Sequence, residues 1–126
     1  MGLGVKDNYI PRLLAGWVLF EDQRWTYDQA HQEVSSVASW LRNQGISKGD
    51  RVAIAMRNYP EWILSYWACV STGIVVVGMN AWWVADEMEY GLSDSKPKVL
   101  FADSERLHRF FEINSDFGTM KVVGVR

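Results

Sequence analysis

Hydrophobic residues follow a helical spacing in some segments of the chain and a strand-like pattern in others. From Tyr27 to Leu41, apolar residues recur three and four positions apart, which predicts an amphipathic helix of about 16 residues. Thr26 and Gln29 have the spacing of a capping box at its start, and Gly45 offers a left-handed stop at its end. The pattern therefore predicts one helix with both ends defined.

Continuous apolar runs, the pattern of strands buried on both faces, recur between the helical segments. We expect strands at 51–56, 74–79, 98–102 and 120–125. A small hairpin is expected before them, because the turn-like residues 21–23 separate Trp17–Phe20 from Arg24–Thr26. The order of strands and helices predicts an α/β fold, in which a parallel sheet with right-handed crossovers is flanked by helices.

Further helices are expected between the predicted strands. Asn58 is expected to cap the first of them, with Pro60 in its first turn, and Asp103 or Ser104 to cap the last. These helices cover about 60–72, 86–92 and 104–113. No repeat, low-complexity tract or linker interrupts the order, so residues 1–126 are expected to form a single unit.

The composition is that of an ordinary globular protein, with 48% hydrophobic and 22% charged residues. A chain of 126 residues fits one domain and can bury a sizeable core. The net charge of -2 and the lack of a basic run argue against nucleic acid as a partner.

The single cysteine, Cys69, allows neither a disulfide framework nor a paired-cysteine metal site within the chain. A reducing, cytoplasmic setting fits this best. The longest run of apolar and small residues, 68–85, is interrupted by polar residues and glycine, so no transmembrane segment is expected. Residues 1–9 lack the apolar core of a signal peptide.

No residue pattern typical of catalysis, cofactor binding or metal binding stands out. His31 and His108 lie on different predicted helices, with no second ligand at metal spacing, so we interpret both as ordinary helix histidines. Asp86, Glu87 and Glu89 open a helix, where negative charge is stabilised by the helix dipole, and we interpret them as capping and solubilising residues. The sequence therefore nominates no catalytic, cofactor-binding or metal-binding residue.

Two segments with some likeness to nucleotide-binding loops lack the features that such loops need. Residues 93–98 contain no glycine through which backbone amides could approach a phosphate, and they do not lead from a strand into a helix. Gly73 and Gly78 flank a strand instead of preceding a helix, which is not the dinucleotide-binding pattern.

Seven tryptophans are many for a chain of this length. Trp62 and Trp67, on a predicted helix, are expected to fill gaps between helix and sheet. Trp82 and Trp83 follow a predicted strand, and neighbours in sequence cannot easily both enter one core. At least one of them is expected on a surface that another domain or a hydrophobic ligand covers.

Several segments, in order and at matching spacing, resemble the adenylate-forming superfamily of acyl-CoA synthetases, acid-thiol ligases and luciferases. They are Thr26-Tyr27 with its helix, the turn and strand at 45–54, the helix start Met56-Arg57-Asn58-Tyr59-Pro60-Glu61-Trp62, and 78–90 followed by Asp94-Ser95 and 98–103. Together they span about residues 18–103. The form Asn80-Ala81-Trp82-Trp83 looks most like long-chain fatty-acyl-CoA ligases.

The resemblance implies the N-terminal part of an AMP-binding domain. The whole enzyme of that family activates a carboxylic acid with MgATP to an acyl-adenylate and then transfers the acyl group to CoA. The family's phosphate loop, its adenine and ribose motifs and its catalytic lysine would all follow this segment. We therefore expect a scaffold that is inactive alone and binds no cofactor itself, whereas ATP, Mg²⁺ and CoA are implied for the whole enzyme.

Two positions depart from the family pattern. Gly78 stands where the family usually has proline, and Val84 stands where it usually has the threonine that caps the next helix. The loss of that cap should weaken the helix start by about 1 kcal/mol.

Two alternatives to a scaffold segment remain open at this point. The first is a stand-alone, non-catalytic α/β binding or interaction module, or one part of a split synthetase. The second, a flavodoxin-like nucleotide binder, rests on element order alone. The expected partner is the remaining part of the synthetase, or a second copy of the chain joined through exposed sheet edges and apolar surface.

Overall fold

The computed structural model describes residues 18–126 and begins with the predicted hairpin. Strand β1 (Val18–Phe20) pairs antiparallel with β2 (Gln23–Trp25), and Glu21 between them lies in the left-handed region at φ 53°. Trp17, which the sequence assigned to the first strand, lies outside the described residues, as do residues 1–9.

Helix α2 (Tyr27–Asn43) has the start and the end that its sequence pattern predicts. The Thr26 hydroxyl accepts a hydrogen bond from the Gln29 amide (3.2 Å), and the Gln29 side chain accepts one from the Thr26 amide (2.9 Å). Gly45 follows the end of the helix with φ 80°, a conformation that costs a residue without Cβ little. The predicted capping box and left-handed stop are both confirmed.

The main sheet has four parallel strands in the order β4-β3-β5-β6. They are β3 (Arg51–Ala55), β4 (Val75–Gly78), β5 (Val99–Asp103) and β6 (Lys121–Val125). The central strands β3 and β5 are almost entirely buried, because helices cover both faces of the sheet. The predicted parallel α/β architecture is confirmed, and each strand end lies within one residue of its predicted position.

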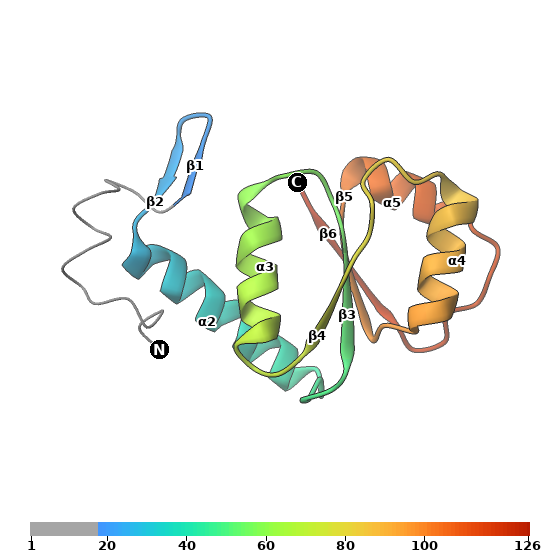
Figure 1. Ribbon diagram of the computed structural model, residues 1–126, viewed down its shortest axis with the longest axis horizontal. Helices are drawn as coiled ribbons and strands as arrows, with labels where there is room; N and C mark the ends of the chain where they lie inside the picture. The colour runs from blue at the N-terminus through green and yellow to red at the C-terminus, as the bar shows by residue number, and fades with distance from the viewer. Residues whose placement is uncertain (1–17) are drawn as a thin grey trace.

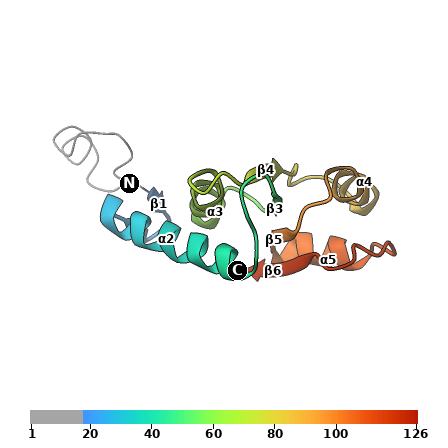
Figure 2. The ribbon, with the colours of Figure 1, turned by 90° about the horizontal axis from the view of Figure 1, so that it is seen from below.

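Two pairs of helices enclose the sheet, as Figures 1 and 2 show. Helices α2 and α3 (Pro60–Val70) cover one face, and α4 (Ala85–Ser95) and α5 (Ser104–Phe111) cover the other. Alternate side chains of the central strands point to opposite faces. Those packed with α2 and α3 are Val52, Ile54, Val99 and Phe101, and those packed with α4 and α5 are Ala53, Ala55, Leu100 and Ala102.

The start of α3 differs from the prediction. The N-cap is Tyr59, not Asn58, and no side chain makes a capping hydrogen bond there. Proline disfavours a helical conformation in the residue directly before it, so Pro60 holds Tyr59 in the extended cap conformation (φ −84°, ψ 159°). Asn58 lies one residue before the cap and is exposed, so its predicted capping role is wrong.

Helix α4 begins after Val84, whose side chain has no oxygen with which to cap it. Half of a capping box is nevertheless present, because the Glu87 carboxylate accepts a hydrogen bond from the Val84 amide (3.0 Å). The capping role predicted for Glu87 is confirmed, and it offsets part of the loss at Val84.

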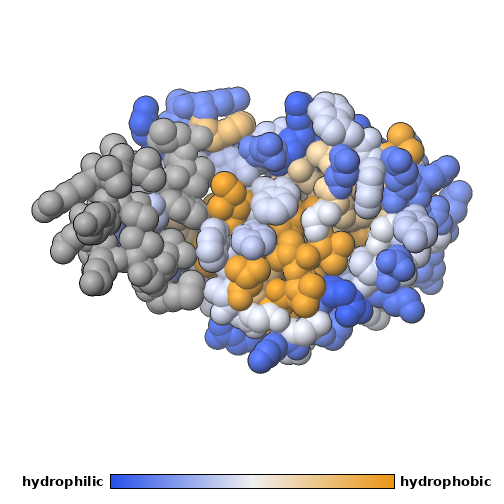
Figure 3. All heavy atoms as spheres, viewed as in Figure 1, coloured by the Kyte–Doolittle hydropathy of each residue, from blue (hydrophilic) through white to orange (hydrophobic). Residues whose placement is uncertain are grey.

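Hydrophobic side chains gather on the outer side of α3 and β4, as Figure 3 shows. Ile63, Tyr66 and Val70 follow one another along the outside of α3 with exposed fractions of 39%, 36% and 36%, and Val75 on β4 is 48% exposed. These residues are called the α3–β4 face below. Val75 lies on the edge strand β4, and the exposed residues of α3 extend this apolar surface beyond the sheet.

Candidate functional site

A hollow of about 580 Å³ lies beyond the carboxyl ends of β3 and β4. Within the described part of the chain, no residue that follows β5 lines the hollow, so it lies to one side of the point between β3 and β5 where the strand order changes direction. The loops that follow β3 and β4 form much of the wall, together with the hairpin. The lining residues are Phe20, Glu21, Arg57, Asn58, Tyr59, Asn80, Ala81 and Trp82.

An arginine and a tryptophan from different loops meet in the wall of this hollow. The guanidinium carbon of Arg57 lies 5.5 Å from the centroid of the Trp82 ring, within the range of a cation–π interaction. The Trp82 side chain is 71% exposed, and its backbone amide donates a hydrogen bond to the Asn80 side chain (2.9 Å). An open indole face beside a cation suits contact with a planar or anionic group.

A second arginine lies over the aromatic rings on the hairpin side. The guanidinium carbon of Arg126 is 5.0 Å from the ring centroid of Phe20 and 5.2 Å from that of Tyr59. Its Nε also pairs with the Glu61 carboxylate at 2.9 Å, and this hydrogen bond raises the pKa of Arg126 above its ordinary value. These contacts join the hairpin to the start of α3 and to the end of β6.

One buried carboxylate connects the ends of the two central strands. Asp103, the last residue of β5, accepts a hydrogen bond from the backbone amide of Arg57, just beyond β3 (3.0 Å). It also caps α5 by accepting from the Arg106 amide (3.0 Å), and it pairs with the Arg106 guanidinium at 3.1 Å. The side chains of Asp103 and Arg106 are only 4% and 1% exposed, so this ion pair is shielded from water.

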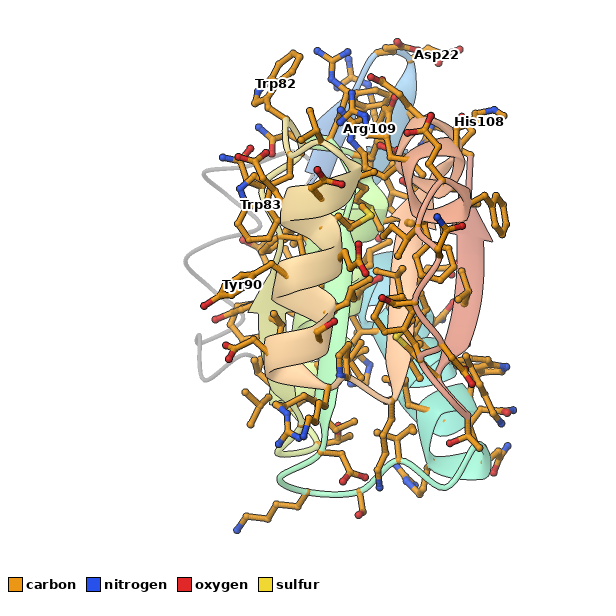
Figure 4. The ribbon with its side chains drawn as sticks, turned by 90° about the vertical axis from the view of Figure 1, so that its right-hand side faces the viewer. Asp22, Trp82, Trp83, Tyr90, His108 and Arg109 are labelled. Carbon is orange, nitrogen blue, oxygen red and sulfur yellow. The ribbon has the colours of Figure 1, made fainter. Side chains whose placement is uncertain are left out.

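The same arginine reaches the loop after β4. Arg106 Nε donates to the carbonyl oxygen of Ala81 (2.8 Å), and Arg109 donates to that oxygen (2.8 Å) and to the carbonyl oxygen of Trp83 (3.1 Å). Figure 4 shows Arg109 and Trp82 at the same end of the molecule. Two guanidinium groups from α5 thus bind the backbone that carries the exposed indole.

The two histidines and the acidic residues at the start of α4 lie apart from this network. His31 on α2 and His108 on α5 are both exposed, as expected of ordinary helix histidines. Asp86 lies in the first turn of α4, and Glu89 accepts a hydrogen bond from the Ser115 hydroxyl. Within residues 18–126, no three His, Cys, Asp or Glu side chains form a group able to hold a metal ion.

The adjacent tryptophans separate as predicted. Trp83 packs against the core beneath α4 and α5, where a Cβ on Gly91 would lie 2.7 Å from its ring, while Trp82 points outward. Trp62 packs against the core on the α3 side, which confirms its predicted gap-filling role. Cys69 is fully buried, and burial raises the pKa of its thiol to about 12, so the thiol is protonated at neutral pH.

Sequence reasoning missed Arg57, which lines the hollow, and Arg106 and Arg109, which bind the backbone of the loop after β4. Asp103 was recognised only as a possible helix cap, although its other partners come from β3 and from the Arg106 side chain. A usable signal was present, namely an aspartate that ends a fully apolar strand and is followed by arginine at the third position. The contacts to Ala81 and Arg57 join residues 25 and 46 positions apart, which no local pattern predicts.

The carboxyl edge of the sheet does not fit a triphosphate cradle. Loops that hold phosphates use glycines with positive φ, which let backbone amides approach the oxygens closely. The described glycines with positive φ are Gly45, Gly49, Gly73 and Gly118, and all of them lie in turns that lead into strands, away from this edge. We therefore derive no catalytic step through ATP or a metal ion from these residues. Separately, none of the helices within 18–126 is long and apolar enough to cross a membrane.

Comparison with known proteins identifies relatives of the chain. The sequence profile of a family described as "AMP-binding enzyme" matches residues 13–125. The mitochondrial medium-chain acyl-CoA ligase ACSF2 of Homo sapiens is 37% identical over 91 residues, which cover 72% of this chain and 15% of that protein. The long-chain-fatty-acid–CoA ligase of Bacillus subtilis is 30% identical, over 66% of this chain and 15% of its own length.

Solved structures agree in fold. The anthranilate CoA ligase AuaEII, solved in complex with anthranoyl-AMP, matches 83% of this chain and 20% of its own with a TM-score of 0.79 and 26% identity. A fatty acyl CoA synthetase of Mycobacterium tuberculosis matches 82% of this chain and 22% of its own, with a TM-score of 0.77 and 31% identity. The chain spans 13% to 22% of the length of the curated relatives that it matches.

Proposed function

Because the chain belongs to the AMP-binding enzyme family, we propose that it forms the N-terminal scaffold segment of an ATP-dependent acyl-CoA synthetase. The whole enzyme would convert a carboxylic acid, ATP and CoA into acyl-CoA, AMP and diphosphate, using Mg²⁺. This chain alone would not catalyse that reaction. The observation that carries the proposal is the family match over 13–125, and the relatives named above are acyl-CoA ligases several times the length of this chain.

The geometry of the segment supports a scaffold role. Helices cover both faces of the sheet, whereas the loops and the hollow at its carboxyl edge lack a phosphate cradle. In this proposal, the groups that stabilise charge on a transferring phosphoryl come from outside residues 18–126. The cytoplasmic location is part of the proposal, and it rests on the single, buried thiol of Cys69.

Pyrophosphate exchange tests this proposal directly. The purified chain should not exchange pyrophosphate into ATP with any fatty acid. A chimera of the Mycobacterium tuberculosis synthetase, with its matching segment replaced by this chain, should form acyl-adenylate, because the transferred segment supplies fold instead of reacting groups. Acyl-adenylate formation by the chain alone, above a heat-killed control, would contradict the proposal.

We propose further that the α3–β4 face is where the remaining part of the synthetase packs. Exposed apolar patches of this kind mark contact surfaces, and charged residues are scarce among its members. In the chain alone, the same face should drive association with a second copy. Self-association can be measured with this chain alone, without the remaining part of the synthetase.

Two valines with matching exposure allow the α3–β4 face and the far edge of the sheet to be tested independently. Val70 on α3 is 36% exposed and Val122 on β6 is 37% exposed, so a lysine is equally tolerable at either position. Light scattering across a dilution series should show that Val70→Lys lowers the apparent mass and that Val122→Lys leaves it at that of the parent. A parent that is monomeric at every concentration and binds no hydrophobic dye would favour the stand-alone module instead.

A further inference from the structure

The loops that follow β3 and β4 are joined by one ion pair at the junction of β5 and α5. The Asp103 carboxylate holds the backbone amide of Arg57, beyond β3, at 3.0 Å. Its partner Arg106 holds the carbonyl oxygen of Ala81, beyond β4, at 2.8 Å. The pair itself lies at the end of β5 and the start of α5. Asp103 and Arg106 therefore touch both loops whose side chains line the hollow.

The ion pair of Asp103 and Arg106 binds the backbone at or next to both partners of the cation–π contact. Arg57 and Trp82 meet at 5.5 Å, but neither side chain is fixed by burial, since Trp82 is 71% exposed and Arg57 is also exposed. Their backbones are held by the hydrogen bond from the Arg57 amide to Asp103 and by the bonds from arginines to the carbonyls on either side of Trp82. The bond from the Trp82 amide to the Asn80 side chain acts beside them. Ordering two exposed side chains costs rotamer entropy, and a mobile backbone would add to this cost, so held backbones favour the contact.

The carbonyl of Ala81 is bound unusually firmly. It accepts hydrogen bonds from Arg106 Nε and Arg109 Nη1, both at 2.8 Å, and bonds to charged donors are about twice as strong as neutral ones. Arg109 Nη1 also donates to the Trp83 carbonyl, and Arg109 Nη2 is oriented by the Glu105 carboxylate at 2.7 Å. The carbonyl oxygens of the residues on both sides of Trp82 are therefore bound by arginine side chains.

We propose that Asp103, Arg106 and Arg109 are positioning residues that set the shape of the hollow by holding Arg57 and Trp82 against each other. The role goes beyond stabilising the fold, because the network ends on the two loops that carry the exposed aromatic face and its cation. It does not depend on the acyl-CoA synthetase assignment, since it concerns contacts within this chain alone.

Fluorine NMR of the full chain labelled with 5-fluorotryptophan tests the proposal. The chain has seven tryptophans, and the Trp82 signal is assigned by its loss in Trp82→Phe. Arg57→Gln removes the cation from the indole directly, so it gives the size and direction of the change in the Trp82 signal when the contact is lost. The test variants are Arg106→Met and Arg109→Gln. The matched control is Lys98→Met, which makes the same change from cation to methionine in an ion pair at the other end of the sheet.

In Arg106→Met and Arg109→Gln, we expect the Trp82 signal to shift or broaden more than the other six, in the direction that Arg57→Gln defines. Lys98→Met should leave it unchanged. Arg106→Lys should recover part of the lost stability and leave the Trp82 signal displaced, because one ammonium cannot span Asp103 and Ala81 as the guanidinium does. A purely structural role would instead restore signal and stability together.

An unchanged Trp82 signal in folded Arg106→Met or Arg109→Gln would overturn the proposal. If Arg106→Met does not fold, Arg109→Gln decides the question, because Arg109 is 23% exposed and its loss leaves the buried pair of Asp103 and Arg106 intact. Equal displacement of all tryptophan signals would likewise count against a specific role at Trp82.

Discussion

The central strands β3 and β5 are joined at both ends by an aspartate and a cation, and the two ends differ mainly in burial. At the amino end, Asp50 precedes β3 and pairs with Lys98, just before β5, at 2.9 Å. At the carboxyl end, Asp103 closes β5, holds the chain just beyond β3 and pairs with Arg106 at 3.1 Å. The Lys98 side chain is 57% exposed, whereas that of Arg106 is 1% exposed.

This difference decides what each pair does. Water and salt compete for the exposed pair, so it adds little to stability, and the turn at 47–50 is held chiefly by the Ser47 amide, which donates to the Asp50 carboxylate (2.8 Å). At the carboxyl end, removing the Arg106 side chain leaves the Asp103 carboxylate buried without its counter-charge. An aspartate–cation pair thus contributes little at one end, whereas at the other end it is buried and binds the loops after β3 and β4.

The largest expected effect is at the buried pair. Arg106→Met should lower the free energy of unfolding by about 3–5 kcal/mol, because Asp103 would remain buried without its counter-charge. Urea denaturation measures this as a lower midpoint at an unchanged slope. Lys98→Met is the matched control, and its midpoint should be indistinguishable from that of the parent. Equal losses of unfolding free energy in the two variants would contradict the view that burial makes the pair at the carboxyl end the stronger one.

A polar residue outside the network should matter far less, even at the carboxyl end. Asn58 lines the hollow but precedes the cap of α3, so Asn58→Ala should change the free energy of unfolding by no more than about 0.5 kcal/mol. Replacing a true cap usually costs about 1 kcal/mol, and Thr26→Ala at the start of α2 provides that reference in the same denaturation experiment. A loss at Asn58 as large as that at Thr26 would show that Asn58 caps α3 in solution.

The smallest expected effect is a change in titration at the amino end. The Ser47 amide, and after it Lys98, lower the pKa of Asp50 below its ordinary value of 3.8. The folded pKa lies below the unfolded one, so the contribution of Asp50 to stability is present above the unfolded value and is lost as the pH falls through the folded value.

Carbon NMR of the Asp50 carboxyl should therefore give a midpoint below 3.8 in the parent. Lys98→Met should raise this midpoint only part of the way, because the Ser47 hydrogen bond is the larger cause and remains. A midpoint that returns to 3.8 in Lys98→Met would mean that the exposed ion pair, and not the turn, governs this end.

Local patterns in the sequence were sufficient for most of the elements. The capping box at Thr26, the left-handed Gly45 and the continuous apolar strands depend on residues a few positions apart, and the structure confirms them. The error at Asn58 was also local in origin. Asparagine is a favoured cap, but Pro60 restricts the residue directly before it, and this restriction places the cap at Tyr59.

The candidate site was far less accessible to sequence reasoning than the fold. The prediction that Trp82 and Trp83 would separate is confirmed, because it follows from the geometry of adjacent side chains. Nothing in the local pattern indicated that Arg57 would lie over Trp82, or that Asp103 would reach back to β3. Those contacts depend on which strands become neighbours.

The sequence by itself therefore determined the elements, their alternation and the family resemblance, because hydrophobic spacing, caps and turn residues act over a few positions. The tertiary structure alone decided that β5 would lie beside β3, which brings Asp103 to Arg57 and Arg106 to Ala81. It also decided burial, which makes the pair at Asp103 so different from the pair at Asp50. The strength of a charge interaction depends on the water excluded around it, and only the assembled layers of helix and sheet exclude that water.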